Sequence, residues 1–339
     1  MKLVYTETPA TAMQSHEVDN TFIPEGMEYI TAIYDPAEPI TSEVNAKFVA
    51  DIKDADIIIN SYVYFGKELI DAMDHCKCIS FQSTGYNAAD LEYAAEKGVA
   101  VISILDYCTQ ETAENAIASM MALQRNTLGY NKAIQEDRVW DFSLFPGMQR
   151  VEGQTIAIIG LGRIGQHVAR IAGKGLGMKV IAYDPFLPPE IAEKLDVKLV
   201  DLDTALAEGD VVSCHMNLTK DNKNMFNKET FAKMKKHPIF INEGRGEMVV
   251  EADLKWALDE GIVRAAGIDM LESEDPDLNN CCLIENPPRP NLIINPHSGY
   301  WSDTSDYLVR KYSMENALFY VNGEYDKVSV VRNGVNAVK

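Results

Sequence analysis

The sequence predicts an α/β protein with two doubly wound parallel sheets. Short, nearly continuous apolar segments alternate with segments of helical spacing along most of the chain, as expected for parallel strands covered on both faces. One apolar segment runs directly into a glycine-rich turn. The length of 339 residues is enough for two domains at roughly 100–200 residues each, so we expect one sheet in each half of the chain.

The first sheet is expected to begin at the N-terminus, because an apolar segment starts at Lys2. Its strands are expected at 2–6, 29–34, 57–60, 78–82 and 99–103. Helical patterns separate them, for example over 90–97. The segment 111–138 has apolar residues at helical spacing throughout, and it predicts one long helix that could bridge the two domains.

The second sheet follows this helix. Its strands are expected at 155–159, 179–183, 210–214, 238–242, 265–268 and 291–295. Segments with apolar residues at i, i+4 and i+7, such as Ile164, Val168 and Ile171, lie between them and predict the covering helices. A last helix, about 302–321, could pack back on the first domain and make that domain discontinuous.

Composition and charge exclude several classes of protein. Acidic residues outnumber basic ones 51 to 31, and the formal charge of −20 would repel phosphate backbones and anionic lipid. No apolar run approaches the roughly 20 residues of a membrane helix, and the N-terminus lacks the pattern of a secretory signal. We expect a cytoplasmic protein without nucleic-acid or membrane partners. The six cysteines lack paired metal-ligand spacing, so no metal site is expected.

The glycine-rich turn carries the pattern G-x-G-x-x-G at Gly160, Gly162 and Gly165. An apolar strand precedes it, an amphipathic helix follows it, and a second strand ends at Asp184, which is the context of a dinucleotide-binding turn. The first glycine permits the tight turn, the second lets the backbone approach the pyrophosphate, and the third allows close packing of helix and strand. A structural turn with a surface aspartate is the alternative interpretation.

Asp184 indicates which dinucleotide would bind. Its carboxylate would accept hydrogen bonds from the adenosine ribose hydroxyls and repel a 2′-phosphate. No arginine follows it directly, since the next residues are Pro185 and Phe186. The sequence therefore favours NAD over NADP.

Three non-apolar residues stand at the expected carboxyl ends of strands in the second domain, where doubly wound sheets bind ligands. They are Arg245, Asp269 and His297, and Glu274 lies five residues after Asp269. Hydride transfer to a ketone needs a proton donor, which a histidine beside a carboxylate supplies near neutral pH. An arginine holds the carboxylate of an α-keto acid. Taken singly, His297 could be structural and Arg245 could cap a helix.

Together, these motifs resemble the D-2-hydroxyacid dehydrogenase family over nearly the whole chain, nearest to its D-lactate dehydrogenase and C-terminal-binding-protein-like branches. The matching stretches are 160–165, 242–246, 267–274 and 295–299. The resemblance implies a Rossmann NAD-binding domain at 109–298, inserted into a discontinuous flavodoxin-like substrate domain at 1–108 and 299–339. It also implies a homodimer built on the cofactor domains.

The resemblance further implies roles for individual residues. Arg245 would bind the substrate carboxylate and carbonyl, His297 would be the acid–base group, and Glu274, rather than Glu272, would polarise His297. The implied cofactor-binding residues are Gly160, Gly162, Arg163, Ile164, Gly165, Asp184, Met216, Asn217, Asn222, Glu243, Gly244, Arg245 and Asp269. The implied substrate-binding residues are Ser83, Thr84, Gly85, Tyr107, Arg245 and Tyr300.

The chain departs from the family pattern at two points. Asn217 stands where the family usually has proline, and Glu243-Gly244 stands where it usually has Thr-Ala or Thr-Ser. The stretch 297–301 also resembles the C-terminal-binding-protein corepressors, so an NADH-sensing interaction protein is the alternative function. The acidic charge and the lack of appended disordered tails favour an enzyme.

Aromatic residues are expected to line the substrate side of the site. They are Tyr62, Tyr64, Phe65, Tyr107, Tyr300 and Trp301. The stretch 82–87 contains no lysine or arginine, so a second anionic group on the substrate would lack a partner there. The sequence therefore predicts small or apolar 2-oxoacid substrates, although any one of these rings could instead belong to a core or an interface.

Overall fold

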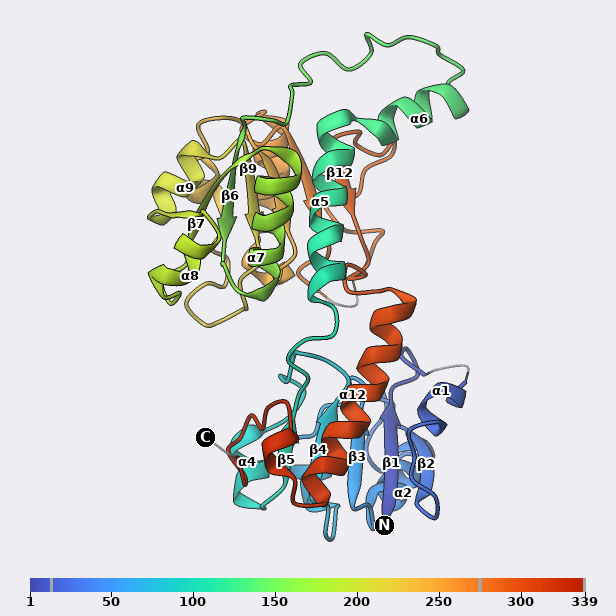
Figure 1. Cartoon of the computed structure of the whole chain (residues 1–339). Helices are drawn as coiled ribbons and strands as arrows, with labels where there is room; N and C mark the ends of the chain where they lie inside the picture. Colours follow the sequence, from blue (N-terminus) through green and yellow to red (C-terminus); the bar gives the residue numbers. More distant parts are fainter. Residues whose placement is uncertain (13–14, 274–275, 338–339) are drawn as a thin grey trace. The chain divides into compact units, whose positions relative to one another are not determined.

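The computed structural model describes residues 1–12, 15–273 and 276–337. The chain divides into two compact units (Figure 1), one formed by 1–107 with 302–339 and the other by 108–301. The fold class expected from the sequence is confirmed, because each unit is built on a parallel sheet. Among the described residues, no helix has both the length and the apolar character needed to cross a bilayer.

Within the described residues, the first unit contains a five-stranded parallel sheet in the order β2-β1-β3-β4-β5. The strands are β1 (Lys2–Glu7), β2 (Glu28–Ile33), β3 (Ile57–Asn60), β4 (Cys78–Phe81) and β5 (Ala100–Ile102). The helices are α1 (Glu17–Asn20), α2 (Glu43–Ile52), α3 (Lys67–Asp71), α4 (Leu91–Glu96) and α12 (Asp303–Val321), with a 3₁₀ turn at Tyr325–Lys327.

Alternation along the strands divides the core of the first unit into two layers. Val4, Ile58 and Ile79 point to the layer that contains α2, α3 and α4, whereas Leu3 and Ile57 point to the opposite layer, against α12. The C-terminal helix α12 therefore covers one face of the N-terminal sheet.

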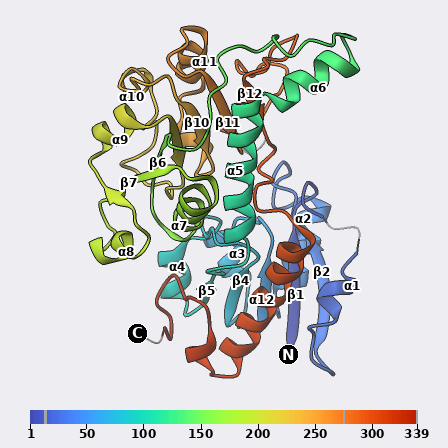
Figure 2. The same cartoon turned by 45° about the horizontal axis from the view of Figure 1, so that its top comes forward.

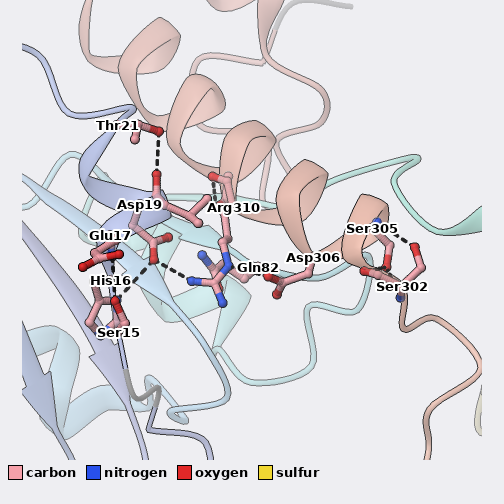
Figure 3. A network of polar contacts seen from close by, with 12 residues as sticks. Ser15, His16, Glu17, Asp19, Thr21, Gln82, Ser302, Ser305, Asp306 and Arg310 are labelled. Atoms are coloured by element: carbon pink, nitrogen blue, oxygen red, sulfur yellow. Dashed lines mark hydrogen bonds and ion pairs between the residues drawn. The ribbon is translucent and has the colours of Figure 1, made fainter.

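A group of charged residues, most of them buried, joins α12 to α1 (Figure 3). The Arg310 guanidinium lies 2.7 Å from a carboxylate oxygen of Asp19, and also 3.0 Å from one of Asp306 on its own helix. The His16 ring lies between two carboxylates, 3.3 Å from Asp19 and 3.6 Å from Glu7. Because Asp19 and Glu7 are 1% exposed, their charges depend on these partners.

In the described part of the second unit, a seven-stranded parallel sheet has the order β12-β11-β10-β9-β6-β7-β8. Its strands are β6 (Thr155–Ile159), β7 (Lys179–Tyr183), β8 (Lys198–Leu199), β9 (Val211–Cys214), β10 (Ile239–Asn242), β11 (Ala265–Ile268) and β12 (Leu292–Ile294). Its helices are α5 (Thr109–Arg125), α6 (Thr127–Gln135), α7 (Arg163–Arg170), α8 (Pro189–Lys194), α9 (Leu202–Glu208), α10 (Lys228–Phe231) and α11 (Glu251–Asp259), with a π-helical turn at Ile171–Gly175 and a 3₁₀ turn at Gly246–Met248.

Helices cover both faces of this sheet. Buried side chains of α5, α7 and α8 form the core on one face, and those of α9, α10 and α11 form the core on the other. Helices α5 and α7 lie side by side in both views (Figures 1 and 2). The chain order reverses between β6 and β9, which places the topological switch point of the sheet at the carboxyl ends of these two strands.

The expected strands agree with the observed ones to within a residue or two at each end, and β8 was not expected. The single long helix expected at 111–138 is wrong. The chain breaks at Asn126, whose φ of 48° and ψ of 40° are left-handed, and α6 then begins at Thr127. Asparagine adopts this conformation readily and ends helices with it, although the apolar spacing continues across the break.

Candidate functional site

The glycine-rich turn connects β6 to α7 at the switch point of the second sheet. Gly160 has a φ of +94°, and a Cβ there would lie 2.8 Å from Cγ of Met216, which follows β9. A Cβ on Gly165 would lie 2.2 Å from the carbonyl oxygen of Gly160. A Cβ on Gly162 would meet no described atom within 4 Å. Packing explains the first and third glycines, whereas the space beside Gly162 fits the close approach of a phosphate to the backbone.

The helix that follows starts at Arg163, so its free N–H groups point toward the turn. Arg163 is exposed and Ile164 is half-buried. Asp184 follows β7 at the same edge of the sheet. Its carboxylate accepts hydrogen bonds from the backbone N–H groups of Leu161 at 2.9 Å and Phe186 at 3.0 Å. Each oxygen keeps a lone pair for a further donor, so this carboxylate both supports the turn and can accept a ribose hydroxyl.

The loop after β9 is braced by Asn222. This side chain is buried, accepts a hydrogen bond from the N–H of Thr219 at 2.7 Å, and donates to the carbonyl of Asn217 at 2.8 Å. The side-chain amide of Asn222 therefore makes its hydrogen bonds within the loop, whereas Asn217 is exposed to solvent. A direct contact of Asn222 with a cofactor stays a prediction.

Just before this loop, His215 is buried at the end of β9. Its Nε2 lies 2.8 Å from the hydroxyl of Ser213, and its Nδ1 has no hydrogen-bond partner among the described residues. Burial lowers the pKa of His215 to about 3, because the imidazolium would lose its hydration. His215 is therefore neutral near pH 7.

The loop after β10 places Arg245 at the rim of the sheet. The buried Asn242 side chain accepts from the N–H of Gly244 at 3.1 Å and donates to the carbonyl of Arg245 at 3.0 Å. The half-buried Arg245 guanidinium donates to the carbonyl of Gly244 at 2.7 Å. A Cβ on Gly246 would lie 1.7 Å from the carbonyl oxygen of Leu271, so only glycine lets this loop pack against the one after β11.

The ends of β11 and β12 are joined through Asp269. Its backbone N–H donates to the carbonyl of Asn242, and its own carbonyl accepts from the N–H of His297 at 2.6 Å. Its carboxylate accepts from the N–H groups of Ser298 at 3.0 Å and Gly299 at 2.9 Å. Asp269 is 2% exposed, so the structure shows it holding the His297 turn, and its contact with a cofactor stays a prediction.

His297 itself has a φ of +51°, an uncommon conformation that these hydrogen bonds support. Its half-buried ring packs edge-to-face against Tyr300 at a centroid distance of 6.2 Å. Glu274, the expected partner of His297, lies outside the described residues. The structure therefore brings Arg245, Asp269 and His297 to the ends of three neighbouring strands, as the sequence predicted.

Glu243 lies beneath this rim. It is 6% exposed, and its two carboxyl oxygens accept from Nδ2 of Asn115 on α5 at 3.0 and 3.2 Å. Burial and the nearby Asp269 carboxylate raise the pKa of Glu243 well above that of an ordinary glutamate. The sequence suggested a cofactor contact here but gave no sign of Asn115, which is 128 positions away in the chain.

The expected substrate-binding loop lies in the first unit. The hydroxyl of Ser83 donates to the carbonyl of Gly85 at 2.7 Å, Thr84 is exposed, and Tyr107 is half-buried. A cation that the sequence did not indicate lies near this loop. The Arg332 guanidinium lies 4.4 Å from the centroid of the Tyr86 ring, and its Nε donates to the hydroxyl of Ser103 at 2.7 Å. Arg332 comes from the C-terminal segment, so no local pattern indicated it.

The expected aromatic wall is partly wrong. Phe65 is fully buried in the core of the first unit, where its ring packs near Phe48. The neighbouring Tyr62 and Tyr64 and the later Trp301 are more than half exposed. Alternation in the extended segment turns Phe65 inward, which the run of aromatic residues concealed.

Residues 117–299 match the family model described as "D-isomer specific 2-hydroxyacid dehydrogenase, NAD binding domain". The chain is 34% identical over 257 residues to hydroxypyruvate reductase from Blautia hydrogenotrophica, covering 74% of this chain and 77% of that one. It is also 34% identical over 264 residues to D-3-phosphoglycerate dehydrogenase from Methanocaldococcus jannaschii, covering 77% of this chain. The chain spans about half the length of that relative, since the match covers 49% of it.

A solved structure of D-lactate dehydrogenase from Aquifex aeolicus, complexed with NAD and lactic acid, superposes with a TM-score of 0.78 and 26% identity, covering 96% of both chains. The chain thus has the architecture of a nicotinamide-dependent dehydrogenase. It belongs to the D-isomer specific 2-hydroxyacid dehydrogenase family. NAD is the cofactor, and the glycine turn and Asp184 fit it. Neither the family model nor these relatives support the corepressor alternative.

Proposed function

We propose that the chain transfers a hydride reversibly between NADH and a 2-oxoacid, giving a D-2-hydroxyacid. The observation that carries the proposal is the order of groups along one edge of the second sheet. The glycine turn lies at β6, and Arg245, Asp269 and His297 follow β10, β11 and β12 on the same side of the switch point. An anion-binding turn, a guanidinium and an imidazole in this order suit a dinucleotide and an oxoacid.

For the cofactor, we propose that α7 and Gly162 hold the pyrophosphate and that Asp184 binds the adenosine ribose. We propose Met216, Asn217 and Gly244 as neighbours of the remaining part of the dinucleotide. The nicotinamide, when bound, supplies or accepts the hydride. The protein's contribution is to orient the partners and to move the proton.

For the substrate, we propose that Arg245 binds the carboxylate through two parallel hydrogen bonds, which also orients the adjacent carbonyl. Its guanidinium has one hydrogen bond to the Gly244 carbonyl, and this bond fixes the side chain at the loop. We propose Ser83, Thr84, Gly85 and Tyr107 as the contribution of the first unit, and Tyr300 as a further substrate neighbour.

For proton transfer, we propose His297 as the acid–base group. During reduction its imidazolium donates a proton to the carbonyl oxygen as the hydride reaches the carbon, and during oxidation the neutral ring accepts the hydroxyl proton. Glu274 would stabilise the imidazolium. The turn geometry supports this role, since the carbonyl of Asp269 accepts from the N–H of His297 and its carboxylate accepts from the N–H groups of Ser298 and Gly299.

The test is NADH consumption by the whole chain with a panel of 2-oxoacids, followed by chiral analysis of the product. The panel contains pyruvate, 2-oxoisocaproate, phenylpyruvate, hydroxypyruvate and glyoxylate. Formation of the D-enantiomer supports the proposal. No turnover of any 2-oxoacid, or formation of the L-enantiomer, contradicts it.

We also propose a homodimer formed through the second unit. The segment that follows α6 (Figure 1) carries two large apolar side chains. Trp140 is 88% exposed and Phe142 is 91% exposed, and exposed apolar patches of this kind mark interaction surfaces. A second copy would cover these side chains. Replacement of both residues by serine should convert a dimer to a monomer in sedimentation experiments.

We also propose a cytoplasmic location. All six cysteines lie in the described part of the chain and are free thiols, as expected in a reducing compartment.

A further inference from the structure

Glu243 lies between helix α5 and the turn that carries His297. On the helix side, Nδ2 of Asn115 donates to both of its carboxyl oxygens, at 3.0 and 3.2 Å. The same amide accepts, through Oδ1, a hydrogen bond of 3.3 Å from Asn295 at the end of β12. Two amides therefore connect Glu243 to the strand that leads into the His297 turn.

On the turn side, Glu243 lies against Gly299. A Cβ built on Gly299 would lie 2.7 Å from Oε2 of Glu243 and 2.8 Å from Oδ2 of Asp269. The two carboxyl groups thus flank the same glycine, and they are no further apart than the sum of these distances. Any side chain at position 299 would separate them, so the glycine permits the close approach.

Two ionised carboxylates so close together and so deeply buried would repel each other strongly. The hydrogen bonds decide which one keeps its charge. Asp269 accepts from the N–H groups of Ser298 and Gly299, which stabilise a carboxylate. Among the residues that the structure describes, Glu243 accepts from one neutral amide, that of Asn115. Among the described groups that face Glu243 from α5, β11 and the turn after β12, Asp269 is the charged one.

We propose that Glu243 is a positioning residue, a neutral carboxylic acid that joins Asn115 to the Asp269–Gly299 contact and so holds the backbone that presents His297. The inference rests on the proposed function, because it takes His297 as the acid–base group. The connection is short, since Asp269 binds the N–H of His297 through its carbonyl and those of the next two residues through its carboxylate. If Glu243 ionised, repulsion would act on Asp269 and therefore on this turn.

Two substitutions separate shape from charge. Glu243→Gln keeps the size and stays neutral at every pH, and its amide can still accept from Asn115 and donate toward Asp269. Glu243→Ala removes the bridge. The control is Glu260→Gln, at an exposed glutamate just after α11.

The first readout is the imidazole resonance of His297 in the full-length protein, labelled with ¹³C-histidine and assigned by its loss in His297→Gln. We expect Glu243→Gln to leave this resonance and its titration unchanged and Glu243→Ala to shift both. In 2-oxoacid reduction, Glu243→Ala should lower kcat at least about tenfold, while Glu243→Gln stays within about threefold of the wild type. Equal losses in both variants, or an unchanged resonance in Glu243→Ala, would overturn the proposal.

The second readout is the free energy of unfolding against pH, which needs no substrate. The pKa of Glu243 is raised in the folded state, so folded Glu243 keeps its proton at pH values where the unfolded chain has lost it. The stability that protonated Glu243 contributes is therefore lost as pH rises through the folded pKa. Glu243→Gln should therefore gain stability relative to the wild type as pH rises from about 4.5. The inference is overturned if the difference in unfolding free energy between Glu243→Gln and the wild type is as independent of pH as the difference between Glu260→Gln and the wild type. Absence of 2-oxoacid turnover would instead contradict the proposed function alone.

Discussion

The carbonyl of Asp269 accepts a hydrogen bond of 2.6 Å from the N–H of His297, and this bond joins the end of β11 to the turn after β12. Because Asp269 also binds the next two N–H groups with its carboxylate, one residue sets the backbone on both sides of the histidine. Gly299, two residues after His297, lets this turn pack closely against the buried carboxyl groups of Glu243 and Asp269. The position of the His297 imidazole therefore also depends on this glycine.

A methyl group at that glycine should impair proton transfer. Gly299→Ala would place a Cβ within 2.8 Å of both buried carboxyl groups, so the turn must move. We expect kcat for 2-oxoacid reduction to fall at least about tenfold, with a smaller change in the Kd for NADH. Gly175→Ala is the control, because its Cβ would have one neighbour, 4.0 Å away. Wild-type kcat in Gly299→Ala would show that the turn tolerates displacement.

Asp184 should determine the preference for NADH over NADPH. Its carboxylate can accept a ribose hydroxyl and would repel a 2′-phosphate. We expect Asp184→Ala to weaken NADH binding by about 10–100-fold, the value of a hydrogen bond to a charged group, and to narrow the gap to NADPH. Asp184→Ala also loses the hydrogen bond to the N–H of Leu161, which will weaken the binding of both NADH and NADPH somewhat. The measurement is therefore the ratio of the Kd for NADPH to the Kd for NADH. Glu208→Ala on α9 should leave it unchanged. Equal Kd values in the unmutated protein would contradict the assignment.

His215 should make the fold sensitive to acid. Its pKa is about 3 in the folded state and about 6.5 when unfolded, so the unfolded chain binds a proton that the folded chain does not. Its contribution to stability is complete above the unfolded pKa and is lost as pH falls from about 6.5 toward 3, at up to about 1.4 kcal/mol per pH unit. In denaturant titrations, the free energy of unfolding should decline less between pH 7 and pH 5 in His215→Phe than in the wild type. Parallel curves for the two proteins would show that His215 is not the cause.

Substrate preference should favour small or apolar 2-oxoacids. We expect pyruvate, 2-oxoisocaproate or phenylpyruvate to exceed oxaloacetate, 2-oxoglutarate and phosphohydroxypyruvate in kcat/KM, because an unpaired second anion is costly to bury. Arg332 is a described cation beside the expected carboxylate loop, although it already binds Ser103 and lies over the Tyr86 ring. A tenfold advantage for a doubly charged substrate, about 1.4 kcal/mol, would contradict the prediction. Arg332→Met would then show whether this arginine is responsible.

The sequence predicted the strands well because a strand buried on both faces leaves a short apolar run that few other structures produce. The rim residues were also predictable, since Arg245 and His297 interrupt the pattern just where β10 and β12 end. The break at Asn126 was missed, because apolar spacing continues through it while the backbone turns left-handed.

Contacts between distant parts of the chain were beyond local patterns. Asn115 meets Glu243, and Arg332 reaches Tyr86, only because the sheets bring separate elements together. Phe65 was placed on the wrong side, since an aromatic run does not show which ring faces the core. The glycines were informative in a different way, because Gly160 and Gly165 are required by packing whereas Gly162 leaves space for a ligand.

The role of His297 as proton donor is tested most directly by 2-oxoacid reduction in His297→Ala under saturating NADH. We expect kcat to fall by about 10²–10⁴-fold, the usual contribution of a general acid, while NADH still binds. His237→Ala is the matched control, because His237 is an exposed histidine of the same unit, and it should keep wild-type kcat. A kcat in His297→Ala close to that of His237→Ala would contradict the assignment of His297 as the proton donor.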